Sequence, residues 1–218
     1  MKTQSILLAG FVLGAFAIIG VTLVAITHLT VDQRIADNQY QAMQRKLATI
    51  LPAGQSANDP LADRIQVPAR DFLGVETSQV YRVRKGEEPV AVVLEPVVPD
   101  GYAGPIRLLV SVLHDGTLGG VRVLSHHETP GLGDKIEEAK SDWVLHFQGK
   151  SLTDPPLDKW TVKRDGGEFD QFTGATITPR SIVNAVKNTL IYVKQQGDQL
   201  FVPVDTGAPT PATVQEKS

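Results

Sequence analysis

The sequence has no cysteine among its 218 residues, and this absence excludes several kinds of site. Without thiols the chain can form no disulfide, no thiolate zinc site and no cysteine-ligated iron–sulfur cluster. Any electron chemistry must therefore use a cofactor that other side chains hold. The redox state of the compartment does not follow from the missing cysteines.

An excess of charge of either sign is also missing, because 21 Lys and Arg nearly balance 24 Asp and Glu. The formal net charge is -3 and no basic stripe stands out, although a nucleic-acid partner would need one. We therefore expect no nucleic-acid partner. Two phosphate-binding signatures are missing as well: there is no Gly-Lys-Ser/Thr loop, and Ile136 stands where a dinucleotide fingerprint needs its third glycine.

A long apolar run stands at the N-terminus. Residues 6–26 read ILLAGFVLGAFAIIGVTLVAI and carry no charge. A helix needs about 20 such residues to cross a bilayer. The alternative is a cleaved signal peptide, but its apolar region spans about 7–15 residues, and no good Ala-x-Ala site follows this run. We predict a short N-terminal end at 1–5 and a transmembrane anchor at 6–27. Positive charges flank both ends of the run, which leaves its orientation open.

The remaining chain divides by composition. Apolar residues at helical spacing predict a helix over 31–51, which Pro52 and Gly54 end. We assign residues 28–60 to a connecting helix and linker, and residues 61–203 to a single domain. The segment 204–218 is rich in Pro, Thr, Ala and Gly and predicts a disordered tail.

Within the domain, apolar and alternating runs predict strands at 80–84, 89–94, 106–113, 118–125 and 160–164. Asp115-Gly116 predicts a hairpin turn between two of them, and Asp100-Gly101 marks a second turn. Helices are expected over 134–147 and from Thr178-Pro179, with Thr178 as the cap. The second has a buried stripe made of Ile182, Val186, Leu190 and Val193. The predicted fold class is α+β, with an antiparallel sheet flanked by helices.

The first place where chemistry can sit precedes this last helix and reads Asp170-Gln171-Phe172-Thr173-Gly174-Ala175-Thr176. Gly174 and Ala175 leave little bulk around Thr176, so a large group can reach its hydroxyl. Backbone N–H groups at a helix N-terminus also favour a phosphate. The alternative is that these threonines only cap a helix and line a turn.

The second place is the loop at 125–135, which includes Glu128-Thr129-Pro130-Gly131-Leu132-Gly133. A metal site is one interpretation of His126, His127 and Glu128. However, neighbouring side chains on a strand point to opposite faces, so one ion would not easily bind all three. We predict no metal. A tight glycine-rich loop would let the backbone approach a flat group. The alternative is that the loop is an ordinary strand-to-helix connection.

Together the two places resemble a known family. The run Asp170-x-x-Thr173-Gly174-Ala175-Thr176 is similar to the flavinylation motif of FMN-binding domains in the G subunit of the Rnf (or Rsx) complex, and in the C subunit of the sodium-translocating NADH:quinone reductase. The loop from Glu128 to Gly133 is similar to the same family. The resemblance covers nearly the whole chain apart from the tail. The short chain looks more like the Rnf protein, with the quinone-reductase protein as the alternative.

The resemblance implies an FMN whose phosphate is esterified to Thr176, and no soluble substrate. A separate flavin transferase would attach it, using FAD and a divalent metal. Thr173, Gly174 and Ala175 would shape the attachment turn, Asp170 would face the transferase, and the loop residues Glu128, Thr129, Pro130, Gly131, Leu132 and Gly133 would line the flavin. The partners would be the other subunits of a redox-driven ion pump in the bacterial inner membrane, with the domain on the periplasmic side. A stand-alone membrane-anchored flavin reductase and a cofactor-free scaffold are the alternatives of other classes.

Overall fold

The computed structural model describes residues 2–51 and 58–201, and the predicted tail at 204–218 lies outside these ranges. Contacts divide the chain after Arg45 into two compact units. Each unit is described by itself.

The first unit is a single helix. Helix α1 (Lys2–Ile50) has 49 residues and continues into the start of the second unit. Its stretch Gly10–His28 has a mean hydropathy of 2.3 and is long and apolar enough to cross a membrane. Large apolar side chains such as Phe11, Leu13 and Phe16 are exposed along this stretch, which suits contact with lipid. The helix predicted at 31–51 is confirmed as the later part of α1. The apolar stretch near the N-terminus agrees with single-pass membrane anchoring.

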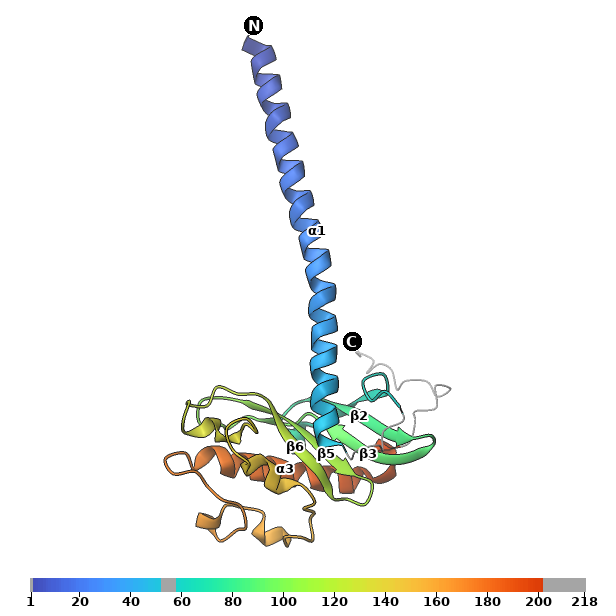
Figure 1. Ribbon diagram of the computed structural model, residues 1–218, viewed down its shortest axis with the longest axis vertical. Coiled ribbons are helices and arrows are strands. Elements are labelled where there is room, and N and C mark those ends of the chain that lie inside the picture. The colour runs from blue at the N-terminus through green and yellow to red at the C-terminus, as the bar shows by residue number, and fades with distance from the viewer. Residues whose placement is uncertain (1, 52–57, 202–218) are drawn as a thin grey trace, which may run out of the picture. The chain divides into compact units, whose positions relative to one another are not determined.

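The second unit contains an antiparallel sheet of six strands (Figure 1), in agreement with the predicted α+β class. The strands are β1 (Arg64–Pro68), β2 (Thr77–Lys85), β3 (Glu88–Leu94), β4 (Val97–Val98), β5 (Ile106–Leu113) and β6 (Leu118–Ser125). Strands β3 and β4 pair in succession with β5, and β6 pairs with β5 along its other edge. The predicted bounds of β5 and β6 are confirmed at both ends. Strands β1 and β4, of five and two residues, were not predicted.

The turn between β5 and β6 confirms the predicted hairpin. Gly116 has φ 85°, and Leu113 donates its N–H to the Thr117 carbonyl at 2.8 Å. The Asp115 carboxylate accepts the Thr117 backbone N–H at 2.9 Å and the Thr117 hydroxyl at 2.7 Å. These hydrogen bonds favour the charged form and lower the pKa of Asp115.

Helix α3 (Ile177–Gln196) packs against one face of the sheet (Figure 1) and completes the main core. The predicted stripe is confirmed, because Ile182, Val186, Leu190 and Val193 are all buried. They share one core with buried side chains of the strands, among them Val80, Leu94, Leu108 and Val110. Each such aliphatic side chain contributes about 1.5–3 kcal/mol when fully buried. This packing fixes where the first turn of α3 lies.

The last turn of α1 belongs to the second unit and lies against β6. Lys46 Nζ donates to the Leu124 carbonyl at 3.3 Å, and Arg122 Nη2 donates to the Thr49 carbonyl at 3.1 Å. A Cβ added at Gly120 would approach Ile50 side-chain atoms at 3.3 Å. Glycine at this point of β6 therefore leaves the room in which Ile50 is buried.

The helix predicted at 134–147 is wrong. The segment instead forms two short 3-10 turns, Gly133–Ile136 and Trp143–Phe147. Between them, the Ser141 hydroxyl donates to the Lys135 carbonyl at 2.6 Å and accepts the Trp143 N–H at 3.3 Å. Such local side-chain bonds compete with the helical ladder.

The strand predicted at 160–164 is also wrong. The chain there forms 3-10 turns at Leu157–Lys159 and Lys163–Asp165, and Val162 makes one isolated bridge with Phe169. Trp160 is buried, and its ring nitrogen donates to the Ser151 and Pro155 carbonyls, at 3.0 and 3.1 Å. Its burial anchors a loop, and no neighbouring strand is involved.

Two further helical segments complete the described chain. Helix α2 (Arg70–Leu73) connects β1 with β2, and the 3-10 turn Gly197–Leu200 follows α3.

Candidate functional site

The segment 170–176, for which the sequence predicts flavin attachment and which is called the attachment segment below, ends at the N-terminus of α3. Thr176 is the cap residue of this helix, so the expectation that Thr178 caps it is wrong. The side chain of Thr176 makes no capping hydrogen bond, and the residue is half-buried. Gly174 before it has φ +84° and is exposed, as is Thr173. The hydroxyl of Thr176 is thus not used for capping, although capping was the alternative role for these threonines.

The glycine-rich loop follows β6 and reaches the attachment segment. Thr129, Pro130, Gly131 and Leu132 are exposed, while Glu128 and Gly133 are buried. A Cβ added at Gly174 would lie 3.4 Å from Cδ2 of Leu132. The two segments singled out in the sequence therefore meet in the fold.

Glu128 lies in the interior and joins three segments of the chain. The residue is 4% exposed, and its carboxylate accepts the Thr178 hydroxyl at 2.6 Å and the Ala103 N–H at 3.1 Å. The glycine-rich loop, the turn after β4 and the first turn of α3 are thereby held together. A buried carboxylate requires such donors, because an unpaired charge in the interior is costly.

Two glycines make room for the Glu128 carboxylate. A Cβ at Gly133 would lie 2.6 Å from Glu128 Oε2, and a Cβ at Gly101 would lie 2.9 Å from Glu128 Oε1. Real Cβ atoms essentially never come this close, so a side chain at either glycine would force the carboxylate to move. The predicted turn at Asp100-Gly101 thus has a second role, since its glycine admits the carboxylate.

His126 orients the start of the loop. Its Nδ1 accepts the Glu128 backbone N–H at 3.0 Å, and its Nε2 lies 2.7 Å from Glu137 Oε1. His127 is exposed. In the described part of the chain, no group of three or more His, Cys, Asp or Glu side chains is arranged to hold a metal ion.

An apolar surface lies on the three segments that Glu128 joins. Within residues 58–201 the structure exposes four large hydrophobic side chains, and three of them, Tyr102, Leu132 and Ile177, are on these segments. Their exposed fractions are 67%, 43% and 46%. Tyr102 was missed by the sequence reasoning, and its position directly after the Asp100-Gly101 turn is the signal that could have found it. Such clustering marks a binding surface more often than isolated exposed residues do.

Charged pairs flank the attachment segment. Arg180 donates to both carboxylate oxygens of Asp165, from Nε at 2.6 Å and from Nη2 at 3.0 Å. The hydrogen bond from Arg180 lowers the pKa of Asp165, and the same contact raises the pKa of Arg180. Lys163 Nζ lies 2.7 Å from Asp170 Oδ1.

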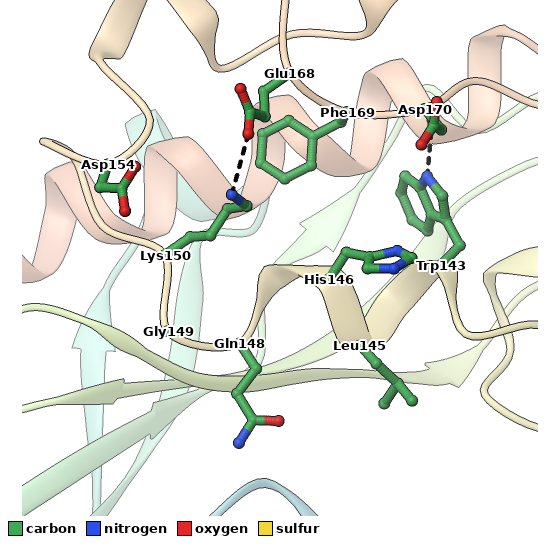
Figure 2. Close-up of a pocket in the computed structure, with 10 residues that line it drawn as sticks. All are labelled: Trp143, Leu145, His146, Gln148, Gly149, Lys150, Asp154, Glu168, Phe169 and Asp170. Atoms are coloured by element: carbon green, nitrogen blue, oxygen red, sulfur yellow. Dashed lines mark hydrogen bonds and ion pairs between the residues drawn. The ribbon is translucent and has the colours of Figure 1, made fainter.

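Asp170 itself borders a cavity of about 610 Å³ that does not include Thr176 (Figure 2). The Trp143 ring nitrogen donates to the Asp170 backbone carbonyl at 2.8 Å, and Lys150 pairs with Glu168 across the cavity at 3.4 Å. The Asp170 side chain is 61% exposed. The backbone of Asp170 is thus fixed while its carboxylate faces solvent.

Comparison with known proteins agrees with this geometry. Residues 101–191 match the FMN-binding domain family, and residues 1–50 match the RnfG N-terminal region. The G subunit of the ion-translocating oxidoreductase complex of Pseudomonas aeruginosa (strain UCBPP-PA14) is 46% identical over 201 residues, covering 92% of this chain and 94% of the relative. This chain belongs to the family of Rnf complex G subunits.

Other members of this family are similarly close. The protein of the same name from Pseudoalteromonas atlantica is 44% identical over 193 residues, covering 88% of this chain and 90% of its own. The protein of the same name from Vibrio atlanticus is 42% identical over 199 residues, covering 91% of this chain and 95% of its own. The resemblance to the Rnf G subunit that the sequence motifs indicated is therefore confirmed.

The residues present fit an FMN. Thr176 offers a hydroxyl that the cap does not use, the N-terminus of α3 suits a phosphate, and exposed apolar side chains nearby suit a flat ring. The individual site roles predicted for Asp170, Thr173 and the loop 128–133 stay predictions.

Proposed function

We propose that this chain is the electron-carrying subunit of a membrane-bound, redox-driven ion-translocating complex, and that it carries FMN joined through its phosphate to Thr176. The observation that carries the proposal is the hydroxyl of Thr176, which stands at the first turn of α3 without a capping hydrogen bond. FMN would supply the redox chemistry, because it takes up two electrons and passes them on singly. The protein would contribute position and electrostatics.

The apolar residues near Thr176 support a place for the ring. Leu132 reaches the attachment turn, and Ile177 follows Thr176 directly. With Tyr102 they provide exposed apolar surface on the segments that Glu128 fixes. Burying this surface under a flat ring would remove an unfavourable contact with water.

The anchor supports a role at a membrane. Relatives are named as subunits of an ion-translocating oxidoreductase complex, so we assign the other subunits of such a complex as partners. We place the anchor in the bacterial inner membrane and the domain on the periplasmic side. A covalent link suits that side, since even nanomolar binding, about 12 kcal/mol, allows loss of a cofactor into a compartment with little free flavin.

Maturation would require a flavin transferase that uses FAD and a divalent metal. Full-length protein made together with such a transferase should have the intact mass of one FMN less one water above the bare chain. The denatured band should fluoresce as a flavin. The variant Thr176→Ala should lose both signals, and Thr176→Ser, which keeps a hydroxyl, should keep flavin.

Thr77→Ala is the matched control, because Thr77 is an exposed threonine on β2, outside the motif at 170–176. It should keep the added mass. If Thr176→Ala retains covalent flavin, or if the parent protein stays unmodified in its native host, the proposal is refuted.

A further inference from the structure

A charged pair lies one helical turn beyond the attachment threonine. The Arg180 N–H donates to the Thr176 carbonyl at 3.4 Å, so the two residues share one face of α3. Side chains of a helix lean toward its N-terminus, which directs the Arg180 side chain over the turn that contains Thr176. Asp165 reaches this place from another segment and engages both Nε and Nη2 of Arg180.

Stability gives little reason for this pair. The side chains of Arg180 and Asp165 are 46% and 35% exposed. Exposed ion pairs usually contribute little to folding. The two-pronged contact is instead the arrangement by which guanidinium groups bind phosphates as well as carboxylates.

The electrostatics of the turn favour an anion. The first turn of α3 contains no acidic residue, and its free N–H groups carry partial positive charge. The carboxylate of Asp165 is therefore an anion held at the edge of a site that suits a phosphate.

We propose that Arg180 is the counter-charge for the flavin phosphate on Thr176, and that Asp165 holds its guanidinium until the phosphate replaces it. The inference rests on the proposed function and assigns two residues to that site. Arg180 is a positioning residue of the attachment step, and Asp165 competes with the incoming phosphate for it.

The attachment step is a phosphoryl transfer. The Thr176 Oγ forms a bond to the FMN-side phosphorus of FAD, and the P–O bond of the anhydride breaks. AMP leaves with the bridging oxygen, and the hydroxyl proton of Thr176 passes to a base of the transferase. No oxidant or reductant is consumed. A guanidinium beside the phosphorus would offset negative charge that builds up during this transfer.

The two halves of the pair should act in opposite directions. The test uses the full chain in detergent with purified flavin transferase, FAD and Mg²⁺, and follows the added mass with time. Arg180→Gln should slow flavin attachment by about three- to tenfold, as expected for losing a charge-assisted contact. Asp165→Asn should leave the rate unchanged or raise it. A merely structural ion pair would slow attachment in both variants, because either substitution breaks the same contact.

The double variant separates competition from simple repulsion. Any gain from Asp165→Asn should disappear in the Arg180→Gln background, because Asp165 acts through Arg180. Arg180→Lys should be intermediate, since it keeps the charge without the two-pronged geometry. A gain that persists without Arg180, or equal rates for Arg180→Gln and the parent, would overturn the inference.

The matched control is Arg70→Gln, which breaks an exposed ion pair with Glu76 elsewhere on the domain. Its attachment rate should equal that of the parent. Failure of the proposed function is recognised separately: in that case the parent itself would gain no flavin mass, whichever residue stands at position 180.

Discussion

The Thr178 hydroxyl donates a hydrogen bond to the Glu128 carboxylate at 2.6 Å, although the two residues lie 50 positions apart in the sequence. Both are buried, and Glu128 is only 4% exposed. This bond connects the glycine-rich loop with the first turn of α3. The two segments that the sequence singled out are thus joined beneath the surface by residues outside the attachment turn.

Removing the donor should destabilise the domain. Thr178→Val keeps the shape of the side chain and leaves the buried carboxylate with one donor fewer. We expect a loss of about 1.5–3 kcal/mol in the free energy of unfolding, as for a hydrogen bond to a charged group. Urea denaturation followed by tryptophan fluorescence measures it. Thr173→Val is the control, since that threonine is exposed; equal stabilities of the two variants would contradict the role given to Thr178.

Gly133 should tolerate no side chain. An added Cβ would lie 2.6 Å from Glu128 Oε2 and 2.9 Å from Glu128 Cβ, and Glu128 is buried. We expect Gly133→Ala to cost about 1–3 kcal/mol by overpacking. Gly131→Ala is the comparison, because Gly131 has φ +79° but nothing within 4 Å of an added Cβ, so it reports backbone strain alone. A smaller loss at position 133 than at 131 in thermal denaturation would be inconsistent with the packing described.

The sequence predicted the parts of the fold that local patterns encode. Strands β5 and β6 and the buried stripe of α3 follow from apolar spacing, and the hairpin follows from Asp115-Gly116. The failures at 134–147 and 160–164 share one feature. Buried aromatic side chains there, such as Trp143 and Trp160, anchor loops through hydrogen bonds of their ring nitrogens. Periodicity alone cannot distinguish this role from a helix or a strand.

The site shows a similar division. Its two segments are readable from local composition, but the side chain that joins them acts through Thr178 and the Ala103 N–H, both distant in sequence. Tyr102 likewise stands next to Ala103, whose N–H meets the Glu128 carboxylate only through the fold. Long-range contacts of this kind leave no local pattern, so only the structure assigns Glu128 a position beneath the surface.

His126 should control the backbone of the glycine-rich loop through one of its two nitrogens. Asn places an acceptor near the position of Nδ1, and Gln reaches the position of Nε2. His126→Asn should therefore keep the bond from the Glu128 N–H, while His126→Gln should lose it and keep contact with Glu137. Hydrogen exchange of the Glu128 amide should be faster in His126→Gln than in His126→Asn. The reverse order would show that contact with Glu137, and not the bond at 3.0 Å, fixes the loop.

Asp115 should make the β5–β6 hairpin sensitive to acid. Its pKa in the folded protein is lowered, chiefly by the hydrogen bonds from Thr117, whereas an aspartate in the unfolded chain titrates near about 3.9. The unfolded chain thus binds the proton more readily, so the stabilisation is present above about pH 3.9 and is lost as the pH falls through the folded-state pKa.

Asp115→Asn keeps an acceptor for Thr117 and removes only the charge. The parent should be more stable than this variant at pH 7, by at most about 1 kcal/mol for so exposed a group, and the difference should be smaller in acid, for example at about pH 2.5. Asp158→Asn, on an exposed 3-10 turn, should show a smaller difference between the two pH values. If the difference for Asp115→Asn stays constant across that range in urea denaturation, the charge of Asp115 does not stabilise the turn.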